Sequence, residues 1–141
     1  MFDSGVGGLS VLGEAVTQLP GEDFIYFGDN GNAPYGTKDP DTVRKLAFSA
    51  VEKLCEHQVK AVVIACNTAT AEAARELRAH YSFPIIGMEP ALKPASEMKG
   101  DGLRLVLATP GTLSSEKICK SVRPFRKERR FPALPGTHGI R

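Results

Sequence analysis

A cysteine stands at the end of the longest apolar run in the chain, within the stretch AVVIACNTAT at residues 61–70. An apolar run that stops at Cys66 and continues with Asn67 and Thr68 is typical of a buried strand leading into a helix. A thiol at that point faces the free amides and the positive end of the helix, which stabilise a thiolate. Cys66 is therefore either a small apolar residue of a core strand or a thiol that carries out chemistry, and position alone favours neither.

Small polar groups also follow the other expected strands. In chain order they are Asp3 and Ser4 in a glycine-rich loop, Gly28 and Asp29, Tyr35 and Gly36 in a following loop, Glu89, and Thr109 and Thr112. In an open parallel sheet, ligands bind outside the carboxyl ends of the strands. These positions together predict a binding crevice at one edge of a sheet.

Each of these positions also has a purely structural interpretation. The loop DSGVGG at residues 3–8 suits an anion, but it lacks the Gly-Lys-Ser/Thr ending of a P-loop and the register of a dinucleotide site. Tyr35 either packs a turn or holds a small acid through its hydroxyl and neighbouring amides. Thr68 and Thr112 suit helix caps equally well. His57 and His80 fall near expected helix ends, so neither a metal site nor a Ser-His triad is predicted.

The elements that must position these residues alternate along the chain. Apolar runs predict strands at 23–27, 60–65, 84–88 and 103–108, and helical periodicity predicts helices at 9–19, 40–57 and 69–80. A first strand ahead of Asp3 has only two residues available, so it is expected to be cut away or barely formed. Strands of this kind, separated by helices, predict an α/β fold with a doubly wound open parallel sheet and helices on both faces.

Apolar residues recur at helical spacing in all three expected helices. Asp39 is a suitable N-cap for the helix at 40–57, and Pro40 suits its first position. The residues expected to face the core from this helix are Val43, Leu46, Ala47, Ala50, Val51, Leu54 and Cys55. From the other two helices they are Leu12, Ala15, Val16 and Leu19, then Ala73, Ala74 and Leu77.

Composition is that of a soluble globular chain, with 42% hydrophobic and 24% charged residues. No apolar run is long enough to span a bilayer, and the N-terminus lacks the pattern of a signal peptide. Three cysteines without a C-x-x-C pair suggest neither zinc nor a redox dithiol, and an odd count favours free thiols in a reducing compartment. We therefore expect a cytoplasmic protein without membrane association.

Charge is distributed unevenly. Residues 123–141 carry six Lys/Arg against one Glu, whereas the rest of the chain is mildly acidic. Periodicity is lost in the same region, so we expect a domain at 1–120 and a basic, irregular tail at 121–141. The tail has few aromatic residues, so nucleic-acid binding is the weaker interpretation.

Five motifs together resemble glutamate racemases of the aspartate/glutamate racemase family over residues 2–118. They are FDSGVGGLSV at 2–11, FGD and PYGTK within 27–38, ACNTAT at 65–70, EPALKPA at 89–95 and ATPGT at 108–112. The resemblance implies one domain of a normally two-domain fold. It also implies a cofactor-independent enzyme that interconverts L- and D-glutamate and supplies D-glutamate for peptidoglycan.

The resemblance further implies a two-base mechanism, in which one cysteine removes the α-proton and a second returns a proton from the opposite face. Carried over, Cys66 is the base that acts on D-glutamate, and Asp3 assists its proton transfers. The substrate-binding residues implied are Ser4, Tyr35, Gly36, Asn67, Thr68, Thr109 and Thr112.

The sequence departs from the family pattern in its second half. The family carries its second cysteine in a Cys-Thr-His motif, which this chain lacks, and Cys119 within KICKS is no substitute. We therefore expect the N-terminal half of a racemase, with the activity of this chain alone left open. Two alternatives stay open: a non-catalytic domain that binds a small dicarboxylic or amino acid, and a relative that acts on aspartate. Apolar surface left uncovered would favour a homo-oligomer.

Overall fold

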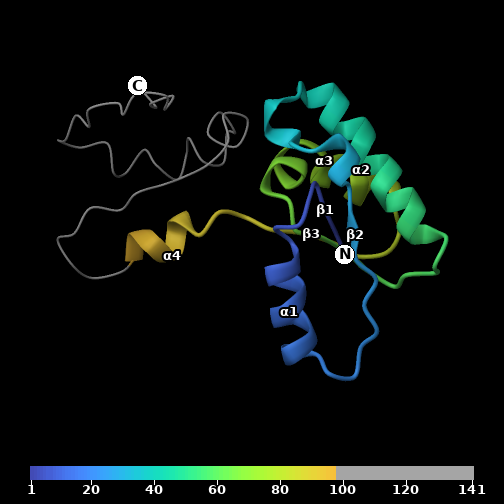
Figure 1. Cartoon of the computed structure of the whole chain (residues 1–141), viewed down its shortest axis with the longest axis vertical. Helices are drawn as coiled ribbons and strands as arrows, with labels where there is room; N and C mark the ends of the chain where they lie inside the picture. Colours follow the sequence, from blue (N-terminus) through green and yellow to red (C-terminus); the bar gives the residue numbers. More distant parts are fainter. Residues whose placement is uncertain (98–141) are drawn as a thin grey trace.

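The computed structural model describes residues 1–97, which form a four-stranded parallel sheet flanked by helices (Figure 1). The elements, in chain order, are β1 (Phe2–Asp3), α1 (Leu9–Gln18), β2 (Phe27–Gly28), the 3₁₀ turns η1 (Asn30–Asn32) and η2 (Tyr35–Thr37), α2 (Pro40–Cys55), β3 (Val62–Ile64), α3 (Asn67–His80), β4 (Ile85–Gly87) and α4 (Leu92–Glu97). The predicted α/β class and the parallel sheet are confirmed.

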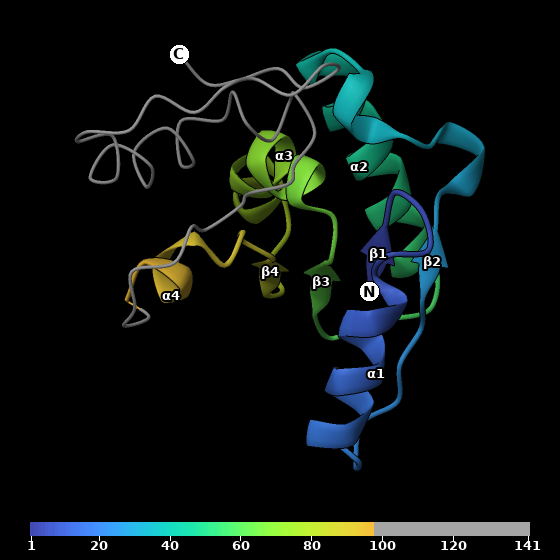
Figure 2. The same cartoon turned by 60° about the vertical axis from the view of Figure 1, so that its left-hand side comes forward.

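The strand order β2-β1-β3-β4 decides which helices share a face of the sheet. The chain steps in one direction from β1 to β2, and in the other direction from β2 to β3 and on to β4. Because crossovers between parallel strands are right-handed, α1 lies on one face while α2 and α3 lie on the other. Figure 2 shows α1 set apart from the α2 and α3 layer, as this topology requires.

The face covered by α2 and α3 holds the core. Helix α2 packs against α3, and α3 packs against β3 and β4. The predicted stripes are confirmed here: most of their members are buried, while Leu46 and Cys55 are partly buried and pack against the core. The carboxylate of Asp39 caps α2 by accepting a hydrogen bond of 2.9 Å from the backbone N–H of Thr42.

The α1 face is far less complete within residues 1–97. Helix α1 has no buried residue, and Val16 and Leu19 are 48% and 53% exposed. On the sheet itself, Ile86 of β4 is also exposed, at 51%. The prediction that helix 9–19 buries its apolar stripe is therefore wrong for the described residues. A periodic stripe identifies the apolar side of a helix, but it does not supply an element to cover that side.

The strand boundaries differ from the predictions in a consistent way. Strand β1 has only two residues, as expected, and it pairs with both β2 and β3. The predicted strand at 23–27 begins only at Phe27, which pairs with Phe2; ahead of it, the Met1 amine donates to the carbonyl of Ile25 at 2.7 Å without extending the strand. The predicted strand at 103–108 and the tail at 121–141 lie outside the described residues. Within residues 1–97, no helix combines the length and apolar character needed to cross a membrane.

Candidate functional site

Backbone hydrogen bonds align the ends of β1, β2 and β3 at one edge of the sheet. The N–H of Asp29 donates to the carbonyl of Asp3 at 3.0 Å, and the N–H of Ala65 donates to the carbonyl of Phe2 at 2.8 Å. Three chain segments that are distant in sequence therefore leave the sheet side by side. The candidate residues that follow these strands share this edge.

Cys66 forms the N-cap of α3. Its Sγ accepts a hydrogen bond from the backbone N–H of Ala69 at 3.4 Å, and the side chain is only 7% exposed. The thiol in turn donates to the hydroxyl oxygen of Ser4, with the two atoms 3.5 Å apart. An amide donor and the positive end of the helix both stabilise negative charge on this sulfur. The contact with Ala69 caps the helix, and the contact with Ser4 places a second polar group against the thiol.

Asp3 directly precedes Ser4 and is enclosed by the glycine-rich loop. Its carboxylate, 8% exposed as a residue, accepts a hydrogen bond of 3.0 Å from the N–H of Gly5. A Cβ at Gly8 would lie 2.8 Å from the Cβ of Asp3 and 2.9 Å from that of Ala65. Only glycine at this position lets the start of α1 pass so close to both strands.

Tyr35 is buried behind the edge, at 1% exposure, and its hydroxyl donates to Oδ2 of Asp29 at 2.7 Å. Burial raises the pKa of Tyr35 far above its usual range, and the hydrogen bond to Asp29 and the charges of Asp29, Cys66 and Asp3 add to this effect. The hydroxyl is therefore a fixed donor to Asp29. For an acidic ligand, this segment would offer its backbone amides rather than the phenol.

Asp29 was not among the residues singled out as catalytic or substrate-binding, although it directly follows a strand in the FGD motif. Besides Tyr35, its carboxylate accepts hydrogen bonds from Nδ2 of Asn32, at 3.0 and 3.1 Å to the two oxygens. Asp29 thereby ties the 3₁₀ turns η1 and η2 to the end of β2. The sequence signal was an acidic residue at a strand exit, which alone does not reveal its partners.

The remaining predicted residues fall into three groups. Ser4 is partly buried beside Cys66, while Gly36 and Thr68 are buried near the same edge. Asn67 is exposed on the first turn of α3. Thr109 and Thr112 lie outside the described residues. The structure therefore brings Asp3, Ser4 and Cys66 together, with η2 packed against α3 beside them.

His57 and His80, two of the three histidines, lie where helices end. His57 follows α2, and His80 is the last residue of α3, with its ring edge-on to Phe48 and Tyr81. Across the described part of the chain, no group of three or more His, Cys, Asp or Glu side chains is placed to hold a metal ion.

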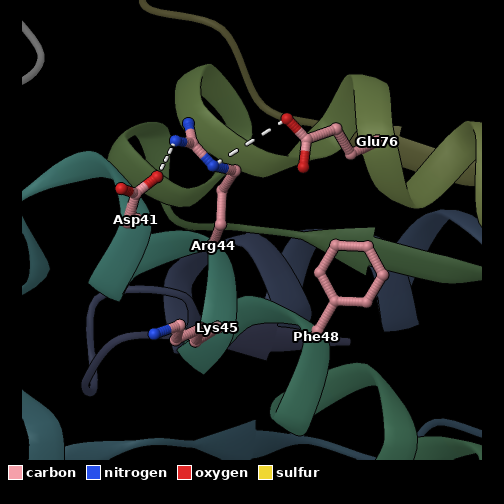
Figure 3. A pocket seen from close by; sticks show the side chains of 5 residues that line it. All are labelled: Asp41, Arg44, Lys45, Phe48 and Glu76. Carbon is pink, nitrogen blue, oxygen red and sulfur yellow. Dashed lines mark hydrogen bonds and ion pairs between the residues drawn. The ribbon is translucent and has the colours of Figure 1, made fainter.

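An open hollow lies elsewhere, on the outer surface of α2 and α3 (Figure 3). It is lined by Asp41, Arg44, Lys45, Phe48 and Glu76. The guanidinium of Arg44 pairs with Asp41 and lies 3.8 Å from Glu76, so the central cation is already neutralised by the protein. None of the residues predicted to bind or react lines this hollow, and we assign it no function.

Comparison with known proteins shows the family of the chain. The family model for Asp/Glu/hydantoin racemases matches residues 4–140. The chain belongs to this racemase family. A curated glutamate racemase of Clostridium novyi is 58% identical over 135 residues, which is 95% of this chain and 52% of that protein. One from Clostridium acetobutylicum is 54% identical over 136 residues, with 53% of its length covered.

Solved structures agree with this family membership. Glutamate racemase of Escherichia coli, described in complex with L-glutamate and the activator UDP-MurNAc-ala, superposes with a TM-score of 0.81 and 37% identity. The enzyme of Aquifex pyrophilus gives a TM-score of 0.77 and 33% identity. The alignments cover 88% and 87% of this chain, but 47% and 49% of theirs. The predicted resemblance to half of a glutamate racemase is confirmed, and the chain spans about half the length of the relatives that it matches.

Proposed function

We propose that this chain carries one half of the acid–base site of a glutamate racemase, with Cys66 as the base that acts on D-glutamate. The observation that carries the proposal is the thiol at the N-terminus of α3, which contacts the amide of Ala69 and the hydroxyl of Ser4. The family membership makes an amino acid with an acidic side chain the expected substrate.

The chemistry required is the transfer of a proton from carbon. The Cys66 thiolate would take the α-proton of D-glutamate, leaving its electron pair on the α-carbon, and the new thiol would return a proton to that carbon. A carbon acid of this kind is very weak, so the base must be activated and held within about 3–3.5 Å of the α-carbon. Asp3 would assist these transfers from the end of the neighbouring strand, without a cofactor.

Substrate binding would use the polar groups of the same edge. Ser4, the Tyr35–Gly36 backbone, Asn67 and Thr68 would hold the carboxylates and the ammonium group of glutamate. The helix N-terminus and the glycine-rich loop both favour anions, which suits the carboxylates. Thr109 and Thr112 would contribute from the part of the chain that the structure does not describe.

Inversion requires a second acid on the opposite face of the α-carbon. Cys55, the other cysteine within residues 1–97, belongs to the core-facing stripe at the C-terminal end of α2 and does not serve this purpose. The full reaction would therefore draw on the length that the relatives have beyond this chain. In the cell, such an enzyme would act in the cytoplasm and supply D-glutamate for peptidoglycan.

The test is proton exchange at the α-carbon. The full chain is incubated with D- or L-glutamate in D₂O, and loss of the α-proton signal is followed by NMR. We expect exchange of D-glutamate without inversion, reduced at least ~100-fold in Cys66→Ala, as is usual when an acid–base group is lost. Cys55→Ala is the matched control and should exchange at the wild-type rate.

Two results would contradict the proposal. A folded chain that binds glutamate but exchanges no proton would make this a binding domain. Exchange that persists in Cys66→Ala would assign the base to another residue. Aspartate as a parallel substrate reports the preference between the two acids.

A further inference from the structure

We infer that Tyr26 is a positioning residue of this site, because its hydroxyl holds residues 4–8 of the glycine-rich loop so that Ser4 stays against Cys66. The effect of Tyr26 on proton exchange rests on the proposed function, whereas its role in holding the loop does not. Tyr26 precedes β2 and is partly buried, and no pattern in the sequence set it apart from its apolar neighbours.

The evidence begins at Gly5, whose backbone is held from both sides. Its carbonyl accepts a hydrogen bond of 2.8 Å from the Tyr26 hydroxyl, and its N–H donates to the Asp3 carboxylate at 3.0 Å. The peptide groups before and after Gly5 are therefore both fixed. Ser4, one residue earlier, is placed with its hydroxyl 3.5 Å from the Cys66 sulfur.

The glycines around Tyr26 make room for this contact. A Cβ at Gly28 would lie 2.7 Å from the Gly5 carbonyl oxygen and 3.2 Å from the Tyr26 ring. A Cβ at Gly8 would lie 3.0 Å from the Tyr26 hydroxyl oxygen. Side chains at these two positions would displace either the ring or the loop, so both glycines fit the chain closely around Tyr26.

Side-chain burial contributes little to holding the loop in place, because its one buried residue is Gly8. Val6, within it, is 66% exposed, and the α1 helix that follows buries no residue. The carbonyls of residues 6–8 accept hydrogen bonds from residues 9–12, which belong to the same helix and would move together with the loop. The bond from Tyr26, 21 residues away in sequence, instead connects the loop to the sheet.

The electrostatics keep Tyr26 a donor. Burial raises the pKa of Tyr26, and the negative charge of Asp3 raises it further, against a smaller opposite effect of a backbone hydrogen bond at Gly8. The hydroxyl therefore stays protonated throughout the neutral range and keeps its bond to the Gly5 carbonyl.

The test measures how fast iodoacetamide alkylates Cys66 in the full chain, with the modified peptides quantified by mass spectrometry. Tyr26→Phe keeps the ring and removes the hydroxyl. We expect the loop to loosen and Cys66 to react roughly two- to tenfold faster, the effect of one lost hydrogen bond. Cys55 in the same sample is the internal control and should react at its wild-type rate. Tyr81→Phe is the matched control variant, and it should leave the Cys66 rate unchanged.

A second variant perturbs the same hydrogen bond, between Tyr26 and Gly5, without changing Tyr26. Gly28→Ala would push apart the Gly5 carbonyl and the Tyr26 ring without removing the Tyr26 hydroxyl group, so it should accelerate Cys66 selectively as well. An unchanged Cys66 rate in a folded Tyr26→Phe chain would overturn the inference. Equal acceleration of Cys55 and Cys66 would also overturn it, because that pattern reports general loosening.

Exchange of D-glutamate in D₂O separates this inference from the proposed function. If the wild-type chain exchanges the α-proton, Tyr26→Phe should lower the maximal exchange rate roughly tenfold or less. If the wild-type chain exchanges nothing, the proposed function fails, and the alkylation rates still decide the role of Tyr26.

Discussion

On one face of the sheet, α2 and α3 enclose a continuous core that includes Val43, Leu54 and Leu77, each 1% exposed or less. On the other face, α1 has no fully buried residue, and Ile86 of the sheet remains exposed. Both helical layers come from sequences with a clear apolar stripe. The difference lies in what each stripe meets: α2 and α3 cover one another, whereas within residues 1–97 α1 has no partner helix.

This difference affects the candidate site, because different residues of the site come from the two faces. The packed face supplies Cys66 and Tyr35, whose positions follow from burial in the core. The open face supplies the loop with Ser4, which leads directly into α1. A residue held by a core keeps its place through many contacts, while a loop before an unburied helix depends on single hydrogen bonds.

The largest effect that would sharpen this comparison is a pair of leucine truncations. Leu77→Ala removes a fully buried side chain of α3, and we expect the free energy of unfolding to fall by about 2–5 kcal/mol. Leu19→Ala, next to α1, removes a side chain that is 53% exposed, and we expect a loss of less than ~0.5 kcal/mol. Urea denaturation of both variants measures the two values. Similar losses would mean that the α1 face is covered in solution.

A smaller effect is expected at Tyr35, where the packed face meets the site. Tyr35→Phe leaves the Asp29 carboxylate without its phenol donor, and the free energy of unfolding should fall by about 1–2 kcal/mol near neutral pH. The pKa of Tyr35 is raised from 10.0 in the folded chain, so above pH 10 the unfolded chain ionises while the folded chain stays protonated.

Wild-type stability should therefore decline as the pH rises above 10, and the phenylalanine variant lacks this contribution. The difference between the two proteins should narrow with rising pH. Urea denaturation at neutral pH and above pH 10 measures it. A difference that stays constant would show that the Tyr35 hydroxyl does not retain its proton preferentially in the folded state.

The smallest effect on stability is expected on the open face, where solubility changes instead. Ile86→Ser and Leu19→Ser reduce the exposed apolar surface area, so self-association should weaken, while the free energy of unfolding should change by less than ~0.5 kcal/mol. Sedimentation velocity over a range of protein concentrations measures the association. Gln18→Ser on α1 is the control. Unchanged sedimentation in both Ile86→Ser and Leu19→Ser would exclude this face as the contact between copies.

Sequence reasoning was most successful where local chemistry determines structure. The Asp39 cap, the stripe of α2 and the turn from strand to helix at Cys66 all depend on neighbours within a few positions, and all three are present. The packing of α1 was not predictable in this way, because a periodic stripe does not specify its cover.

The hydrogen-bond partners of the tyrosine hydroxyl groups could not be predicted from the sequence either. Tyr35 is expected to pack a turn or bind a ligand, and the structure shows in addition that its hydroxyl donates a hydrogen bond to Asp29, six positions earlier. Tyr26 sits in an apolar segment, and its bond to Gly5 depends on how β1 and β2 pair. A side-chain hydrogen bond between segments distant in sequence becomes visible only once the strands are in register. The roles of Asp3 and Ser4 came from the family resemblance rather than from any local pattern.

The two-residue strand β1 has a consequence for the order of folding. It lies in the middle of the sheet, and its pairing with β3 joins Phe2 to Ile64. Within the segment from Pro40 to Gly87, contacting elements are at most two elements apart along the chain, and such contacts form early because they close short loops. Strand β1 would then pair with β3 late, and β2, which pairs with β1 at the edge of the sheet, would join with it. The N-terminal residues and the cysteine would meet only in this last step, so the chemistry of the edge would become available when folding is otherwise complete.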